Sequence, residues 1–201
     1  TLLDWLDFVD GEPGPTRANA LVTAALAAGV TLRTQHSVVA CYDHDTLLVG
    51  PETHSLLHCA QRLLAVGCND LLESFANSDL PGVFTARAVC RALRHGIVPA
   101  RRWVCLGSEG HALAACEALR AAGATVTLLP QESFTWTSLE ALGSTEIKGL
   151  RVGSRHYKCE GIMVGTHAVP ACELAGQLGL ALCYVGRVLG LGVVLLLALR
   201  E

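Results

Sequence analysis

No Cys-x-x-Cys spacing occurs in this sequence, although nine cysteines are spread along its 201 residues. Because their number is odd and they are scattered, the cysteines give no support for a dithiol redox centre, a zinc ribbon or a disulfide framework. His54 and His58 stand four residues apart, but no further ligand follows at a recognised spacing. We therefore expect no metal site. We also expect reduced, largely buried thiols and a cytoplasmic location.

Positive charge is scarce as well. Fifteen Lys and Arg residues against eighteen Asp and Glu residues give a formal net charge of −3, and only Lys148 and Lys158 are lysines. This balance provides no electrostatic basis for binding nucleic acid or an anionic membrane. The three tryptophans are too far apart in sequence to form a spaced stacking surface for single strands. Nucleic acid is therefore excluded as an expected partner.

Long apolar runs are also missing. The most apolar stretch, residues 188–199, is interrupted by Gly190 and Gly192, and it is shorter than the roughly 20 apolar residues of a membrane-spanning helix. We expect no membrane span here, and instead a buried strand or an edge strand that meets a partner. The amino end has no basic segment typical of a secretory signal. It also lacks an initiating Met, which indicates a start inside a longer product.

Apolar residues nevertheless make up 51% of the chain and charged residues 16%, enough to bury a sizeable core. Helical and extended patterns alternate along it, which predicts an α/β fold with a parallel sheet. We expect helices over 16–28, 84–95, 110–122 and 169–178. We expect strands over 30–34, 38–42, 46–49, 62–66, 103–106, 125–129, 146–152, 156–158 and 161–164, those at 146–158 being antiparallel.

The clearest unit is the strand–turn–helix–strand segment from 103 to 129. The strand stops at Gly107, where a dinucleotide-binding turn needs its first glycine, and Ala112 can serve as the small third residue of that turn. We therefore take Gly107, Ser108 and Gly110 as candidate cofactor-binding residues. Glu109, however, occupies the second glycine position, and its carboxylate opposes a phosphate. Two interpretations stay open: a retained dinucleotide site, or glycines that only turn the chain.

The second strand of this unit lacks the acidic residue that usually contacts the ribose of a dinucleotide. Pro130 and Gln131 follow Leu129, and Glu132 is the nearest carboxylate. Binding to the ribose therefore cannot be assigned from the spacing alone.

Three stretches, 60–70, 77–88 and 102–129, together resemble the pyridine nucleotide-disulfide oxidoreductase-like flavoproteins. The most similar branch contains the larger subunits of heteromeric sarcosine oxidase, dye-linked proline dehydrogenase and hydrogen cyanide synthase. The loop ending at Gly67 resembles that family's Ala-Thr-Gly loop beside the flavin nucleotide. The segment from Asn77 to Val83 resembles its branch-specific Asn-Asp-x-Pro-Gly-Val motif. The resemblance spans roughly residues 18–180.

This resemblance implies a Rossmann-like NAD(P)-type unit over 99–155, inserted into an incomplete flavin-type domain. That domain covers 1–98, and residues 156–201 form the return to it and the apolar tail. Val38 stands where the family contacts adenine through a backbone strand, so Val38 and Gly67 join the candidate cofactor-binding residues. The family's Gly-x-Gly-x-x-Gly turn is absent ahead of Thr16, and its Gly-Asp motif is absent after Leu182.

By this resemblance, the chain is expected to be a component of an FAD/NAD(P)-linked oxidoreductase of the amine or imino-acid dehydrogenase type. No catalytic acid, base or nucleophile can be assigned, which disfavours an NAD-dependent enzyme that acts alone. The expected partner is another dehydrogenase subunit or a second copy, bound through the apolar segment 188–199. The alternative is a non-catalytic interaction or scaffold subunit derived from a decayed nucleotide-binding fold.

Overall fold

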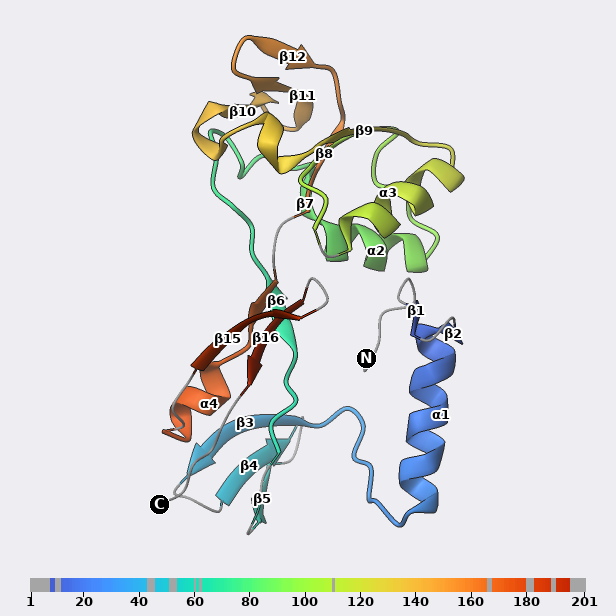
Figure 1. Cartoon of the computed structure of the whole chain (residues 1–201), viewed down its shortest axis with the longest axis vertical. Coiled ribbons are helices and arrows are strands. Elements are labelled where there is room, and N and C mark those ends of the chain that lie inside the picture. Colours follow the sequence, from blue (N-terminus) through green and yellow to red (C-terminus); the bar gives the residue numbers. More distant parts are fainter. Residues whose placement is uncertain are drawn as a thin grey trace. The chain divides into compact units, whose positions relative to one another are not determined.

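The computed structural model describes residues 8–9, 12–42, 46–50, 54–59, 61, 63–109, 111–165, 168–179, 183–188 and 191–195 (Figure 1). The chain forms two compact units. Unit 1 contains Thr1–Arg17 and Asp70–Ala168, and unit 2 contains Ala18–Asn69 and Val169–Glu201. The assignment of residues 1–98, 99–155 and 156–201 to flavin-type and NAD(P)-type parts stays a prediction.

Unit 1 is built on a parallel four-stranded sheet. Its strands are β7 (Val83–Thr85), β8 (Arg102–Leu106), β9 (Thr125–Leu129) and β13 (Gly161–Val164), in the order β7-β13-β8-β9. Every neighbouring pair is parallel, with Met163 opposite Cys105 and Cys105 opposite Leu128. The predicted α/β class with a parallel sheet is confirmed.

Different layers cover the two faces of this sheet. Helices α2 (Ala86–Arg94) and α3 (Ala112–Ala121) cover one face, where Trp103 and Cys105 of β8 are buried. Val104 and Leu106 point to the other face, as the alternation of side chains along a strand requires. That face is covered by an antiparallel sheet of β10 (Leu139–Gly143), β11 (Ile147–Val152) and β12 (Arg155–Tyr157) (Figure 1). Burial on both sides explains why β8 reads as an unbroken apolar run.

Unit 2 contains smaller sheets. Strands β3 (Ser37–Tyr42), β4 (Thr46–Gly50) and β5 (Ser55–His58) form an antiparallel sheet in that order. The short helix α4 (Glu173–Gln177) packs against β3, and β15 (Cys183–Val188) pairs with β16 (Leu191–Leu195). Two elements lie at the limits of the units: β6 (Cys68–Asp70), which pairs with β14 (Ala168–Pro170), and α1 (Gly14–Ala27), which follows the short strands β1 (Phe8–Val9) and β2 (Glu12–Pro13).

Two predicted strands are wrong. Residues 30–34 form no strand, and Val30 and Leu32 are exposed. The described part of 62–66 is also irregular, with the Leu63 side chain 93% exposed. Both segments were predicted from apolar and β-branched residues. In the fold, neither segment has a neighbouring strand to pair with among the described residues, so propensity alone did not produce a strand.

Other boundaries moved for local reasons. The helix predicted over 84–95 begins at Ala86 because Thr85 ends β7 and caps the helix, its side chain accepting a hydrogen bond from the N–H of Ala88 at 3.2 Å. The helix predicted over 169–178 is the strand β14 followed by α4, which begins only after Pro170. Within 188–199, the strand β16 is confirmed. Its side chains lie outside the description, so the partner contact stays a prediction.

Candidate functional site

The turn after β8 is tightly constrained by its neighbours. Gly107 has a φ of +82°, a conformation that favours glycine, and its N–H donates to the carbonyl oxygen of Leu129 at 2.8 Å. A Cβ at this position would stand 2.7 Å from the backbone oxygen of Gly165. Any other residue at 107 would therefore be strained and would also displace the end of β13.

Helix α3 approaches the sheet unusually closely at this turn. A Cβ on Gly165 would stand 2.3 Å from the Cβ of Ala112, the first residue of α3. The N–H of Glu109 donates to the Gly165 oxygen at 3.1 Å, which fastens the turn to the end of β13. The small residue expected at the third position of the turn is thus needed where helix and strand meet.

Some hydrogen-bond donors are available at the start of α3, although the Ala112 N–H already donates to the Glu109 oxygen at 3.1 Å. His111 occupies the N-cap position, and its side chain makes no capping hydrogen bond. The first N–H groups of a helix have no partner within the helix, and they are suited to bind an anion. Ser108 is exposed, and no acceptor within the described residues bonds its N–H. The predicted site residue Gly110 lies outside the described residues.

The side chain of Glu109 acts against these donors. It is half-buried, and a negative charge just ahead of α3 weakens the attraction of the helix start for a phosphate. Its own N–H is already bonded to Gly165. The turn therefore fits a diphosphate through its backbone, while the charge of one side chain opposes the binding.

The sheet order places this turn at a topological switch point. From β8 the chain continues through α3 to β9 on one side. It reaches β13, the neighbour on the other side, only after crossing the opposite face through β10–β12. Ligands of open α/β sheets bind outside the carboxyl ends of the strands at such points. Gly107 and Gly165 follow the carboxyl ends of these two central strands.

The segment after β9 reaches the same turn. Gln131–Ser133 form a short 3₁₀ helix, and the Oε1 atom of Gln131 lies 3.7 Å from the point where a Cβ on Gly107 would stand. Ser133 is engaged elsewhere, since its hydroxyl donates to the Pro130 oxygen at 2.6 Å. Glu132 is exposed. The side chain next to the turn is thus an amide.

A buried thiol pair lies beneath the turn. The Cys105 thiol donates to the Gly107 oxygen at 3.3 Å. A hydrogen bond with Cys116, together with burial, raises the pKa of Cys105 far above its ordinary value. Cys105 is therefore a neutral thiol at pH 7. It supports the turn from below and is not a nucleophile.

A polar cluster at the carboxyl end of β7 was not predicted from the sequence. The Thr85 hydroxyl donates to Oδ2 of Asp70 at 2.5 Å, and Nε of Arg87 lies 3.3 Å from Oδ1 of the same carboxylate. The only sequence signal is Thr85 at the N-cap position, three residues before Ala88. The cluster fixes the start of α2, and its charges neutralise one another.

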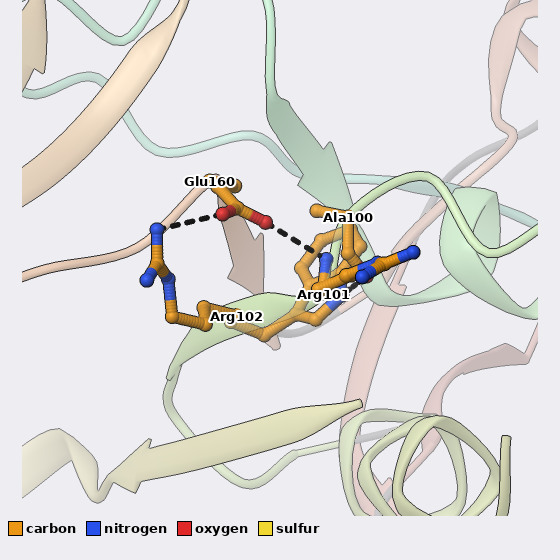
Figure 2. A network of polar contacts seen from close by, with 5 residues as sticks. Ala100, Arg101, Arg102 and Glu160 are labelled. Atoms are coloured by element: carbon orange, nitrogen blue, oxygen red, sulfur yellow. Dashed lines mark hydrogen bonds and ion pairs between the residues drawn. The ribbon is translucent and has the colours of Figure 1, made fainter. Parts of the chain in front are cut away.

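The opposite edge of the sheet holds another network, shown in Figure 2. Oε2 of Glu160 accepts a hydrogen bond from the Arg101 N–H at 3.0 Å, and Oε1 accepts one from Nη2 of Arg102 at 2.7 Å. The hydrogen bond from the Arg101 backbone, with help from Arg102, holds the pKa of Glu160 below its ordinary value of 4.5. These contacts lock the amino ends of β8 and β13 and serve stability.

The other predicted site residues belong to unit 2. Val38 lies in β3 opposite Val49 and is exposed. Gly67 is exposed, has a φ of +75°, and accepts a hydrogen bond from the Ala171 N–H at 3.1 Å. Gly107 and Ser108 belong to unit 1. The proposed flavin contacts of Val38 and Gly67 stay predictions.

The described part of the chain contains neither a metal-ligand cluster nor a membrane-spanning helix. No three His, Cys, Asp or Glu side chains gather there in a way that could hold a metal ion. Among the same residues, no helix combines the length and the apolar character that crossing a bilayer requires.

No protein-family model matches the chain, and no curated protein matches its sequence. Solved structures do match its fold. L-proline dehydrogenase from P. horikoshii superposes with a TM-score of 0.73 at 17% identity, covering 89% of this chain and 37% of that one. An NAD-dependent persulfide reductase from A. fulgidus gives 0.62 at 16% identity, covering 78% and 35%.

An FAD-dependent pyridine nucleotide-disulphide oxidoreductase from Desulfovibrio vulgaris gives a TM-score of 0.58 at 14% identity, covering 85% of this chain and 54% of that one. The predicted resemblance to this group of flavoproteins is thus confirmed for the fold. The chain spans about a third to a half of the length of these structures.

Proposed function

We propose that the chain is a component of an FAD/NAD(P)-linked oxidoreductase of the amine or imino-acid dehydrogenase type, and that unit 1 binds the diphosphate of a dinucleotide after β8. The observation that carries this proposal is the left-handed Gly107 turn, clamped between β9 and β13 at the switch point of a parallel sheet. The fold shared with FAD- and NAD-dependent oxidoreductases supports it.

The residues of the turn have separate roles in this proposal. Gly107 lets the backbone turn without a side chain, while the N–H of Ser108 and the N–H groups of the first turn of α3 after Ala112 donate to phosphate oxygens. Ala112 lets the helix start close to the sheet. A bound nicotinamide or flavin would supply the redox chemistry. Substrate oxidation is assigned to a partner subunit, because no catalytic acid, base or nucleophile is assigned in this chain.

Calorimetric titration with NAD⁺ tests this placement. We expect the wild-type chain to bind NAD⁺ and Gly107→Ala to abolish binding, because the new Cβ pushes against the Gly165 oxygen. Gly123→Ala is the matched control. Gly123 also has a positive φ, of +86°, and lies at the far end of α3 with open space around it. If both variants bind NAD⁺ like the wild type, the turn is not the diphosphate site.

Glu109→Gln provides a second variant that does not disturb the backbone. Removing the carboxylate should tighten NAD⁺ binding, since the negative charge at the phosphate position is lost. Unchanged or weaker binding would contradict a diphosphate beside Glu109.

FAD is the second cofactor in the proposal, with Val38 and Gly67 as its contacts in unit 2. We propose that the partner subunit to which substrate oxidation is assigned also contributes to the flavin site. A flavin absorption band should therefore appear only when the chain is purified with that subunit. A flavin band in the isolated chain would contradict the proposal that flavin binding requires the partner subunit.

A non-catalytic interaction subunit is the second candidate function. It is favoured by the exposed apolar side chains of the β3–β5 sheet, including Leu56, which is 59% exposed, and Val39 and Tyr42. In this case we expect self-association or binding to another subunit through residues 188–199. Light scattering of the intact chain and of a chain without these residues tests it, and a monomer in both samples would exclude a role of the segment in self-association.

A further inference from the structure

The residue that would contact the adenosine ribose of a bound dinucleotide can be identified within unit 1. In nucleotide-binding folds of this type, a residue after the second strand of the unit contacts the ribose of the adenosine half. Here that strand is β9, and its carboxyl end is tied to the turn by the hydrogen bond from the Gly107 N–H to Leu129. The ribose-reading side chain must therefore come from residues 130–133.

Of these residues, Gln131 has a side-chain atom close to the turn. Its Oε1 atom lies 3.7 Å from the position of a Cβ on Gly107. Ser133 uses its hydroxyl on the Pro130 oxygen, and Pro130 has no polar side chain. Glu132, the one carboxylate of the segment, is exposed in the 3₁₀ helix. Gln131 is thus the polar group placed beside the candidate diphosphate site.

We infer that the Gln131 amide is the specificity-determining group of the dinucleotide site, and that the site accepts NAD and NADP with similar affinity. This inference rests on the proposed dinucleotide-binding function. An amide both donates and accepts hydrogen bonds, so it can pair with a ribose 2′-hydroxyl or with a 2′-phosphate. A carboxylate at this place would accept from the hydroxyl and repel the phosphate.

Basic residues that would favour the phosphate are also missing from the described segments next to the turn. Within the described residues 107–109 and 130–135, no Lys or Arg occurs. Arg120, on the last turn of α3, directs Nη2 to the Val126 oxygen at 3.3 Å, near the start of β9 rather than its end. Position 131 therefore carries neither the acid that selects NAD nor the arginine that selects NADP.

The test compares NAD⁺ and NADP⁺, which differ only by the 2′-phosphate, by calorimetric titration of the wild type and two reciprocal variants. Gln131→Glu and Glu132→Gln exchange an amide and a carboxylate at adjacent, exposed positions. Circular dichroism should confirm that both variants are folded. For the wild type we expect the two Kd values to agree within about threefold.

Gln131→Glu should weaken NADP⁺ by about tenfold or more relative to NAD⁺, because the carboxylate repels the 2′-phosphate. Glu132→Gln should leave the ratio unchanged. The inference is overturned if Glu132→Gln changes the ratio, if Gln131→Glu leaves it unchanged or weakens both ligands equally, or if the wild type already discriminates strongly. If the wild type binds neither ligand, the proposed function itself fails, which is a separate result.

Discussion

Replacing Gly107 by alanine probes the constraint on which the candidate site depends. Two costs add at this position. A non-glycine residue at a φ of +82° costs about 1 kcal/mol or somewhat more. The new Cβ would also stand 2.7 Å from the Gly165 backbone oxygen, a distance that real Cβ contacts do not reach.

The second cost can be estimated from what must move. The Gly165 oxygen accepts the hydrogen bond of the Glu109 N–H at 3.1 Å, so its displacement weakens a bond worth about 1 kcal/mol. Forcing a methyl group into a packed site adds roughly 1–3 kcal/mol. We therefore expect Gly107→Ala to lower the free energy of unfolding by about 3–5 kcal/mol.

Gly123→Ala isolates the first cost. Gly123 has nearly the same φ, +86°, but a Cβ there has no atom within 4 Å. We expect it to cost only about 1 kcal/mol. The difference of about 2–4 kcal/mol between the two variants can be measured by urea denaturation, with the fluorescence of buried Trp103 as the probe. Equal losses for both variants would refute the close packing of Gly107 against Gly165.

Three further substitutions test neighbouring parts of unit 1. Glu109→Gln should lower the unfolding free energy by about 0.5 kcal/mol, because a carboxylate near a helix N-terminus is stabilising, while it tightens NAD⁺ binding by about threefold. The stability measured by urea denaturation should therefore fall, while the NAD⁺ affinity measured by calorimetry should rise. Thr85→Ala removes the cap on the Ala88 N–H and the bond to Asp70, and thermal unfolding should show a loss of about 1–2 kcal/mol, whereas no loss would exclude a capping role. Glu160 has a lowered pKa, so its contribution is present above pH 4.5 and is lost as the pH falls through its folded-state pKa. Glu160→Gln should flatten the acid limb of a stability–pH profile, and a profile identical to the wild type would contradict the Glu160–Arg102 contact.

The sequence was sufficient to predict the β8–α3–β9 segment because local and tertiary preferences agree there. Residues 103–106 are apolar and are buried on both faces, and Gly107 and Gly123 stand where the structure has positive φ values. Where burial depends on distant elements, prediction failed. The apolar residues of 63–66 resemble a buried strand, but Leu63 is almost fully exposed because no strand pairs with this segment among the described residues.

Only part of the candidate site could be predicted from the sequence, for the same reason. Gly107 and Ser108 follow a strand with a recognisable motif, so a local pattern identified them. Gly165 and Gln131 come from other strand ends, and their closeness to Gly107 results from the sheet order β13-β8-β9. No local pattern marks either residue. Only parallel pairing, which brings the carboxyl ends of the strands to one edge, makes them neighbours.

The two edges of the parallel sheet differ in how their polar groups are used, and this difference supports the proposed site at the carboxyl edge. At the amino edge, the Glu160 carboxylate satisfies both the Arg101 N–H and the Arg102 guanidinium, and the Glu160 N–H donates to the Arg102 oxygen at 2.9 Å. At the carboxyl edge, α3 begins without a side-chain cap. The Ala112 N–H of this helix donates to the Glu109 oxygen at 3.1 Å, while the other N–H groups at an uncapped helix start need water or a ligand as acceptor. The carboxyl edge is therefore where an anionic ligand would gain most, which is why the binding experiments address Gly107, Glu109 and Gln131.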